Sequence, residues 1–277
     1  MRSPSGLRNG WGTACLRKIH IGPAVFGAVD RGTRLGAKLV ILDVLESTSQ
    51  TLRELAQDGE SEGTVVVAEE QRAGRGRLGR GWSSPKGGLW FSVLLRPHVA
   101  PHEAPKLTLM AGIAVVQALK KHLHLESRLK WPNDVLVQGK KLCGILAESR
   151  SSATLEFVIL GIGINANFLV SALPEELRKT AISVREVLRK PVDRMAMMRA
   201  ILNELEAGYT AFCAGDTGAI VARWKELSET LGRKVRVETG TGIVEGVAED
   251  VDERGALVVR TPEGPVTVDA GDCIHLS

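Results

Sequence analysis

The stretch AGRGRLGRGW, from Ala73 to Trp82, holds four glycines and three arginines within ten residues. Glycine loses more conformational freedom on folding than any other residue, so this stretch predicts an irregular loop. Such a loop suits a small anion, because glycines let backbone N–H groups approach oxygen atoms and arginines add planar sets of donors. It also suits nucleic acid, whose phosphates arginine neutralises without reading sequence. A plain solvent-exposed loop is the third reading of these residues.

The segment before the loop predicts a strand, a helix and a second strand. Residues 39–44 form an apolar run of β type. Ser47 followed by Gln50 has the spacing of a capping box, and apolar residues then recur at helical spacing up to Gly59. The β-branched run in residues 63–71 predicts a strand that leads directly into the loop.

The segment after the loop continues the mixture of strands and helices. Residues 88–97 predict a strand that ends at a proline, and residues 106–123 predict a long, mostly apolar helix. Three strands are expected within residues 128–149, and one buried strand within residues 154–167. Two helices are expected between residues 193 and 231. This order predicts a mixed α/β (α+β) catalytic domain.

The composition changes after Leu231 and differs again at the start of the chain. Residues 232–277 contain only short strand-like runs separated by turn signals, which predicts a small all-β domain such as an SH3-like barrel. Residues 1–38 begin with a basic, glycine-containing stretch and predict a loosely ordered extension, too short for a helix-turn-helix domain. The catalytic domain is therefore expected over residues 39–231.

Composition limits the class of protein. The chain has 277 residues, of which 44% are hydrophobic, and a formal net charge of +4, which suits an anionic ligand. Its four cysteines form no CxxC pair, so neither a disulfide framework nor a zinc site is expected. No apolar run approaches the ~18 residues that a membrane span needs. These features predict a protein of the cytoplasm.

Three further motifs have a physical reason to bind a ligand. In KWPNDV, the proline restrains the residues before it and so fixes the direction of Lys130. In KLCGILAE, Gly144 interrupts an apolar strand, and GIGIN repeats this feature at Gly161 and Gly163. Glycine within a strand marks either a bulge or a close approach of backbone to a ligand.

Taken together, the chain resembles the biotin protein ligases, also called biotin–acetyl-CoA-carboxylase ligases, in a short form without the N-terminal DNA-binding domain. The resemblance runs from about Leu39 to the C-terminus and depends on ESTS, EEQRAGRGRLGRGW, KWPNDV, KLCGILAE and GIGIN, which occur in the family's order. It implies the biotin/lipoate ligase type of catalytic domain and a two-step reaction. Biotin and ATP give biotinyl-5′-AMP, and the biotinyl group then passes to a lysine of a biotin carboxyl carrier protein.

The resemblance also implies a role for each matching residue. It makes Lys130 and Arg77 the catalytic residues. The residues expected to bind biotin are Ser47, Thr48, Ser49, Gln71, Arg75, Gly76, Arg77, Lys130, Gly144, Gly161 and Gly163. The residues expected to bind ATP are Arg75, Arg77, Arg80, Lys130 and Asn165. Mg²⁺ is expected with ATP, and its ligands are not assigned.

Some positions depart from the family, and alternatives stay open. Ser49 stands where the family usually has asparagine, Leu78 stands where it often has arginine, and the tail offers His275 instead of an arginine. A lipoate–protein ligase shares this fold and chemistry. A nucleic-acid-binding module is disfavoured, because only 4% of residues are aromatic. We expect no specific DNA binding and no membrane association, and the resemblance leaves a homodimer open.

Overall fold

The computed structural model describes residues 20–23 and 34–276. Its largest element is an eight-stranded sheet with the order β1-β2-β3-β4-β8-β7-β6-β5, in which only β2 and β3 pair in parallel. The strands are β1 (His20–Pro23), β2 (Lys38–Leu45), β3 (Thr64–Gln71), β4 (Leu89–Leu95), β5 (Arg128–Lys130), β6 (Asp134–Val137), β7 (Lys140–Ser151) and β8 (Leu155–Ile164).

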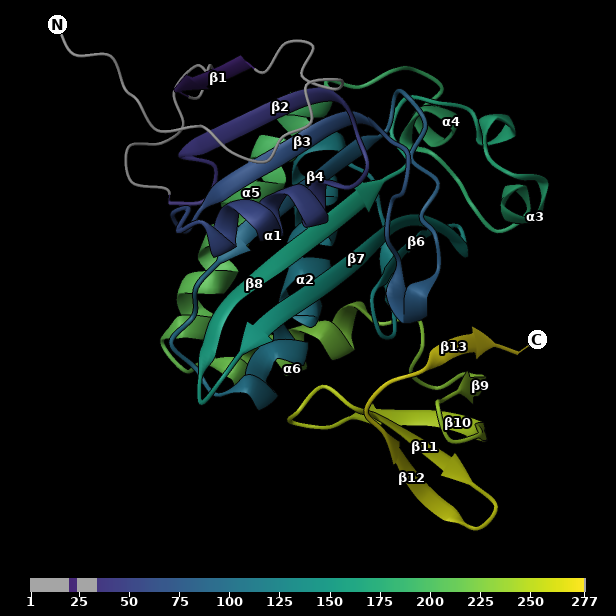
Figure 1. The fold of residues 1–277 in the computed structure, drawn as a ribbon. Helices are drawn as coiled ribbons and strands as arrows, with labels where there is room; N and C mark the ends of the chain where they lie inside the picture. Colours follow the sequence, from purple (N-terminus) through teal and green to yellow (C-terminus); the bar gives the residue numbers. More distant parts are fainter. Residues whose placement is uncertain (1–19, 24–33, 277) are drawn as a thin grey trace, which may run out of the picture.

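Helices cover both faces of this sheet (Figure 1). Helices α2 and α5 lie on one face together with α6, and α1 lies on the other. The helices are α1 (Thr48–Gln57), α2 (Ala104–Leu123), α3 (Glu175–Arg178), α4 (Val184–Leu188), α5 (Arg194–Cys213) and α6 (Thr217–Leu227). Short 3₁₀ turns lie at η1 (Arg77–Gly79), η2 (Pro101–Glu103) and η3 (Val170–Ala172).

The alternation of side chains along β3 divides the core between the two faces. Val65 and Val67 belong to the large cluster under α2 and α5, whereas Val66 packs with Leu52 of α1. The predicted strand at residues 39–44 and the helix after it are confirmed as β2 and α1. Ser47 caps α1 by accepting a hydrogen bond from the backbone of Gln50.

The last part of the chain forms a separate five-stranded antiparallel sheet, here called the C-terminal sheet. Its order is β12-β11-β10-β9-β13, so β12 and β13 are its two edges. The strands are β9 (Lys234–Glu238), β10 (Ile243–Val251), β11 (Leu257–Thr261), β12 (Gly264–Val268) and β13 (Asp272–His275). The all-β character is confirmed. Among the described residues the sheet is not closed, so the SH3-like barrel and the domain boundaries stay predictions.

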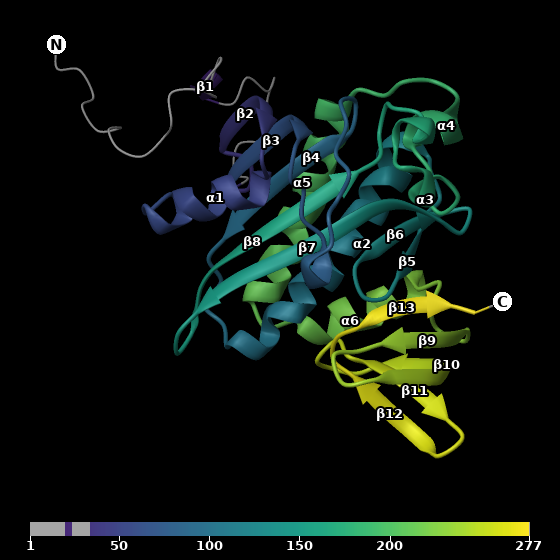
Figure 2. The same ribbon diagram turned by 45° about the vertical axis from the view of Figure 1, so that its right-hand side comes forward.

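The C-terminal sheet packs against the end of the larger sheet where β5 and β6 lie (Figure 2). Trp131, which follows β5, is fully buried in this junction. Its backbone N–H donates to Thr230 Oγ1 at 3.0 Å, and its indole N–H donates to the backbone oxygen of Gly255 at 3.0 Å. The tryptophan of the KWPNDV motif therefore joins the two parts of the molecule.

The expected N-terminal extension falls mostly outside the described residues. Its described portion includes β1, which pairs with the edge of β2. Within residues 20–23 and 34–276, we find no helix with the length and apolar character needed to cross a membrane.

Candidate functional site

A pocket of about 260 Å³ lies between the glycine-arginine loop and the face of the sheet that carries α1. We call residues 73–82 the arginine loop. The pocket brings together twelve of the thirteen sequence-predicted site residues, which are Ser47, Thr48, Ser49, Gln71, Arg75, Gly76, Arg77, Arg80, Gly144, Gly161, Gly163 and Asn165. The thirteenth, Lys130, is not among the residues that line it.

The floor of the pocket consists of three glycines on neighbouring strands. Gly144 of β7 pairs with Gly163 of β8, and Gly161 lies two residues before Gly163 on the same face. The alternating residue Ile162 points to the core under α2 instead. A Cβ at Gly163 would lie 2.6 Å from Nε1 of Trp82. The missing side chains thus make a shallow, flat surface on which an indole now lies.

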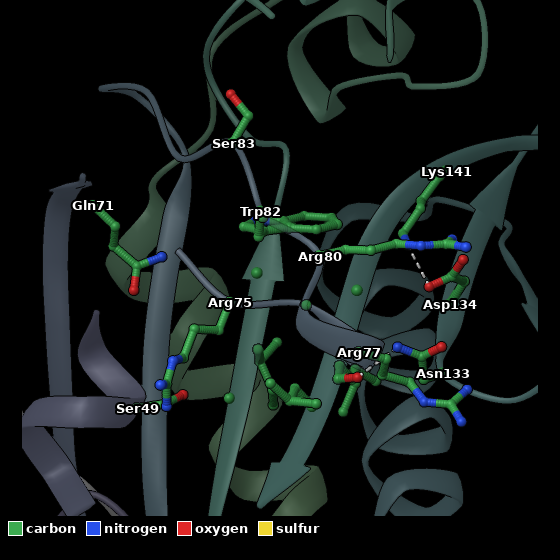
Figure 3. A pocket seen from close by; sticks show the side chains of 18 of the residues that line it. Ser49, Gln71, Arg75, Arg77, Arg80, Trp82, Ser83, Asn133, Asp134 and Lys141 are labelled. Carbon is green, nitrogen blue, oxygen red and sulfur yellow. Dashed lines mark hydrogen bonds and ion pairs between the residues drawn. The ribbon is translucent and has the colours of Figure 1, made fainter. Parts of the chain in front are cut away.

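Trp82 occupies the centre of the pocket (Figure 3). Its ring lies over Gly144 and Gly163, and it meets the buried Trp90 edge-on at 6.3 Å between ring centres. Its indole Nε1 is buried and has no hydrogen-bond partner among the described residues. A buried donor without a partner is costly, so this N–H is available to a ligand.

The end of the pocket next to α1 is a connected set of hydroxyl and amide groups. Gln71 Oε1 accepts hydrogen bonds from the backbone N–H of Thr48 at 2.8 Å and from its hydroxyl at 3.1 Å. Ser92 Oγ lies 2.8 Å from Thr48 Oγ1 and 3.0 Å from Ser49 Oγ. Gln71 also donates to Ser84 Oγ at 2.8 Å. Ser92 and Ser84 were not singled out from the sequence, because a single serine within or after a strand carries no signal of its own.

The arginine loop is a closed hairpin. Arg75 and Gly81 form an isolated bridge, and the backbone N–H of Gly76 donates to the backbone oxygen of Arg80 at 2.8 Å. Leu78 at the tip has a φ of 55°, and 67% of its surface is exposed. A left-handed backbone is uncommon at a leucine. Because its side chain is exposed, apolar packing does not hold the tip of the loop in place.

The three arginines of this loop point in different directions (Figure 3). Arg75 extends towards Ser49 and reaches Glu148 at 3.4 Å. Arg77 and Arg80 extend the other way, towards the C-terminal sheet, and burial lowers the pKa of the Arg77 guanidinium. Arginine is not deprotonated in proteins near neutral pH, so Arg77 remains charged.

Lys141, at the start of β7, is the lysine that lines the pocket. Its Nζ lies 2.6 Å from Asp134 Oδ1 and 5.1 Å from the centre of the Trp82 ring. Lys130 is not among the residues that line the pocket, and its catalytic role stays a prediction. Its charge instead acts on Cys273 and His275 of the C-terminal sheet.

Asn165 lines the pocket, and its contact to ATP or metal stays a prediction. It is only 3% exposed, and its Nδ2 donates to the backbone oxygens of Lys141 at 3.3 Å and Ile182 at 3.1 Å. The side chain thus braces the start of β7, where Lys141 leaves the strand. Asn133 has a similar role, since its Nδ2 donates to the backbone oxygen of Ile145 at 2.7 Å.

The donor set does not fit a metal ion held by the protein. Within the described ranges, no three His, Cys, Asp or Glu side chains gather as a metal site would require. The pocket lining has two carboxylates, and each is paired with a cation: Asp134 with Lys141 and Asp272 with Arg80. Mg²⁺ prefers phosphate and water oxygens, so any Mg²⁺ here would arrive with a polyphosphate ligand.

Comparisons with known proteins agree with this architecture. Residues 41–165 match the biotin/lipoate A/B protein ligase family, and residues 230–276 match the biotin protein ligase C terminal domain. The chain is 38% identical over 232 residues to the bifunctional ligase/repressor BirA of Bacillus subtilis (strain 168), covering 83% of this chain and 71% of that protein.

In two further comparisons, the match to this chain extends over most of the other protein's length. The chain is 37% identical over 245 residues to the biotin--[acetyl-CoA-carboxylase] ligase of Mycobacterium tuberculosis, covering 85% of this chain and 89% of that protein. The structure of the biotin protein ligase from Aquifex aeolicus in complex with biotin and ATP matches with a TM-score of 0.74 and 33% identity. That match covers 85% of this chain and 97% of the other.

Proposed function

The chain belongs to the biotin protein ligase family, and we propose on this premise that it makes biotinyl-5′-AMP from biotin and ATP and transfers the biotinyl group to a lysine of a biotin carboxyl carrier protein. One observation carries the proposal: a single pocket has a neutral polar end at Thr48 and Gln71, a flat glycine floor, and a cationic end at Arg77 and Lys141. Biotin has the matching order of a polar ureido ring, an apolar chain and a carboxylate.

The polar end suits the ureido group of biotin. The hydroxyls of Thr48 and Ser49 and the amide of Gln71 offer both donors and acceptors to the pocket, and the buried Ser92 hydroxyl holds the two hydroxyls from behind. A cyclic urea presents two N–H donors and one carbonyl acceptor, which this set can satisfy. Ser49 keeps a hydroxyl where the family usually has an amide, and its hydrogen bond to Ser92 gives it a fixed position.

The cationic end suits the chemistry of adenylate formation. A carboxylate oxygen of biotin attacks the α-phosphorus of ATP, the new P–O bond forms, and the bond to the leaving pyrophosphate breaks. Both reactants are anions, so a fixed cation between them lowers the barrier more than it stabilises either reactant alone. We assign this role to Lys141 and Arg77, which line the same pocket, and the role that the resemblance implies for Lys130 stays a prediction to be tested beside it.

In the second step, the neutral amine of the carrier lysine attacks the acyl carbon of the mixed anhydride. An amide bond forms, the acyl–phosphate bond breaks, and AMP leaves with the electron pair. Water competes for the same carbon, so the intermediate must be shielded from solvent. The arginine loop, which forms one wall of the pocket, is the element suited to that shielding.

The proposal also includes a location. Cys143, Cys213 and Cys273 are free thiols, which agrees with a reducing compartment such as the cytoplasm.

The test is incubation of the purified protein with ATP, labelled biotin and a carrier domain, with lipoate as the competitor. We expect label on the carrier domain and pyrophosphate in solution, with little effect of lipoate. A carrier domain whose acceptor lysine is replaced by arginine is the control, and it should stay unlabelled. Labelling that lipoate abolishes at equal concentration would instead support the lipoate–protein ligase, and no labelling with either acid would refute both.

A further inference from the structure

Two side chains of the arginine loop contact the C-terminal sheet at adjacent residues. Arg80 pairs with Asp272 at 2.6 Å, between its Nη1 and the carboxylate Oδ2. Arg77 Nη1 donates to the backbone oxygen of Gly271 at 3.1 Å. The residues joined are more than 190 positions apart in the sequence, and all four line the pocket.

The receiving side of this contact is rigid. Gly271 lies so close to β9 that a Cβ there would be 2.6 Å from Val237 Cγ1 and 2.8 Å from the backbone oxygen of Glu238. Asp272 begins β13 and pairs with Glu238 in the ladder. The backbone that carries this carbonyl and this carboxylate is therefore held by the sheet.

The arginine loop is less constrained than the C-terminal sheet that it contacts. Four of its ten residues are glycine, and Leu78 at the tip is exposed with no apolar anchor. A compliant loop held at two points by a rigid neighbour takes its position from that neighbour. The charge matters as well, because Asp272 without Arg80 would present a bare carboxylate to an anionic ligand.

We propose that Asp272 is a positioning residue of the ligase reaction: through Arg80 it holds the arginine loop over the pocket, so that the C-terminal sheet keeps the activated intermediate covered until the carrier arrives. This inference rests on the proposed function for the identity of the intermediate. The contact itself joins groups of this chain alone.

The experiment compares Asp272→Lys with the wild type in two measurements. Amide hydrogen exchange of residues 76–81 in the ligand-free protein should be about threefold to tenfold faster, since a pair exposed at 59% and 38% has modest strength and the variant adds like-charge repulsion. Release of biotinyl-AMP into solution, relative to carrier labelling, should rise by a similar factor.

Two further variants separate positioning from general damage. The charge swap, Arg80→Asp with Asp272→Arg, rebuilds the pair in reverse and should return the exchange rate to within about twofold of wild type. Glu245→Lys breaks the ion pair with Arg236 on another part of the C-terminal sheet, and it should change neither measurement. Thermal unfolding of all variants reports on global stability.

Unchanged exchange in Asp272→Lys would overturn the inference, and so would a charge swap that leaves the loop as open as the single variant. Increased leakage without faster exchange would also overturn it, because Asp272 would then act on the ligand directly. The exchange measurement needs no reaction. If the wild type makes no biotinyl-AMP, the proposed function fails while the role of Asp272 in holding the loop is still decided.

Discussion

Lys141→Met is the substitution that tests the proposed chemistry most directly. Methionine has a similar length and no charge, so the change removes the cation that lies 2.6 Å from Asp134 and keeps most of the side-chain volume. Loss of one preorganised charge partner typically costs about 10²–10³ in rate, which corresponds to about 2.7–4 kcal/mol of transition-state stabilisation. We expect that loss in the rate of pyrophosphate release.

The same change should also lower stability. The Asp134 side chain is only 16% exposed, so it loses its paired cation with little water to replace it. Leaving a partly buried carboxylate without its partner costs about 1–3 kcal/mol of unfolding free energy. The double variant Asp134→Asn with Lys141→Met should recover most of that stability, because no unpaired charge remains, and it should recover none of the rate.

The assay measures pyrophosphate release at saturating biotin and ATP, with unfolding in urea as the stability measurement. Lys130→Met is the matched comparison, because it is the same substitution at the end of β5, which β6 separates from β7, at a side chain outside the pocket lining. We expect it to lower the rate less than Lys141→Met does, since the Lys130 side chain lies outside the pocket lining. If Lys130→Met loses activity and Lys141→Met does not, the assignment of Lys141 is refuted and the prediction from KWPNDV is supported.

Three further outcomes are expected. Gly163→Val places a side chain against the Trp82 ring and should weaken biotin binding at least about tenfold, measured by calorimetry; a loss that merely follows a lower Tm would contradict the ligand-wall interpretation. Trp131→Phe removes the indole donor to Gly255 and should cost about 1–3 kcal/mol in urea unfolding, whereas an unchanged midpoint would show that this hydrogen bond does not stabilise the junction. Burial, with nearby cations, lowers the pKa of His275 to about 4. As the pH falls from about 6.5 towards 4, His275 therefore gains a proton in the unfolded chain but not in the folded chain. The free energy of unfolding should fall by about 1–2 kcal/mol over this range, after allowance for partial exposure of the ring. His275→Gln should flatten that decline, and an equal decline in the variant would show that His275 is not its source.

Local patterns predicted much of the fold. The apolar run of residues 39–44, the cap at Ser47 and the helical spacing after it are short-range signals, and each corresponds to β2 or α1. The glycines at 144, 161 and 163 predicted either a bulge or a close approach of backbone to another group. The structure has close approaches at all three: the indole of Trp82 lies against Gly144 and Gly163, and the hydroxyl of Ser49 lies against Gly161.

What the sequence could not predict depends on contacts between distant segments. Lys130 and Lys141 both stand at strand ends, and only the position of Asp134 next to Lys141 distinguishes the lysine that lines the pocket. The pairing of Arg80 with Asp272 spans 192 positions and leaves no local pattern. Closure of the expected barrel depends on whether the edge strands of the C-terminal sheet pair with each other. The periodicity of side chains within a single strand carries no information about that pairing.

The glycine floor has a consequence for how this site can evolve. Where a pocket is shaped by side chains, a mutation can enlarge it by trimming one of them. At Gly144, Gly161 and Gly163 there is nothing left to trim, so every substitution adds atoms and makes the slot shallower. Mutations at these three positions can therefore only narrow the range of ligands that the pocket accepts. A related protein that binds a bulkier acid would need its extra space from changes elsewhere, either in the arginine loop or in the distance between the glycine floor and Trp82.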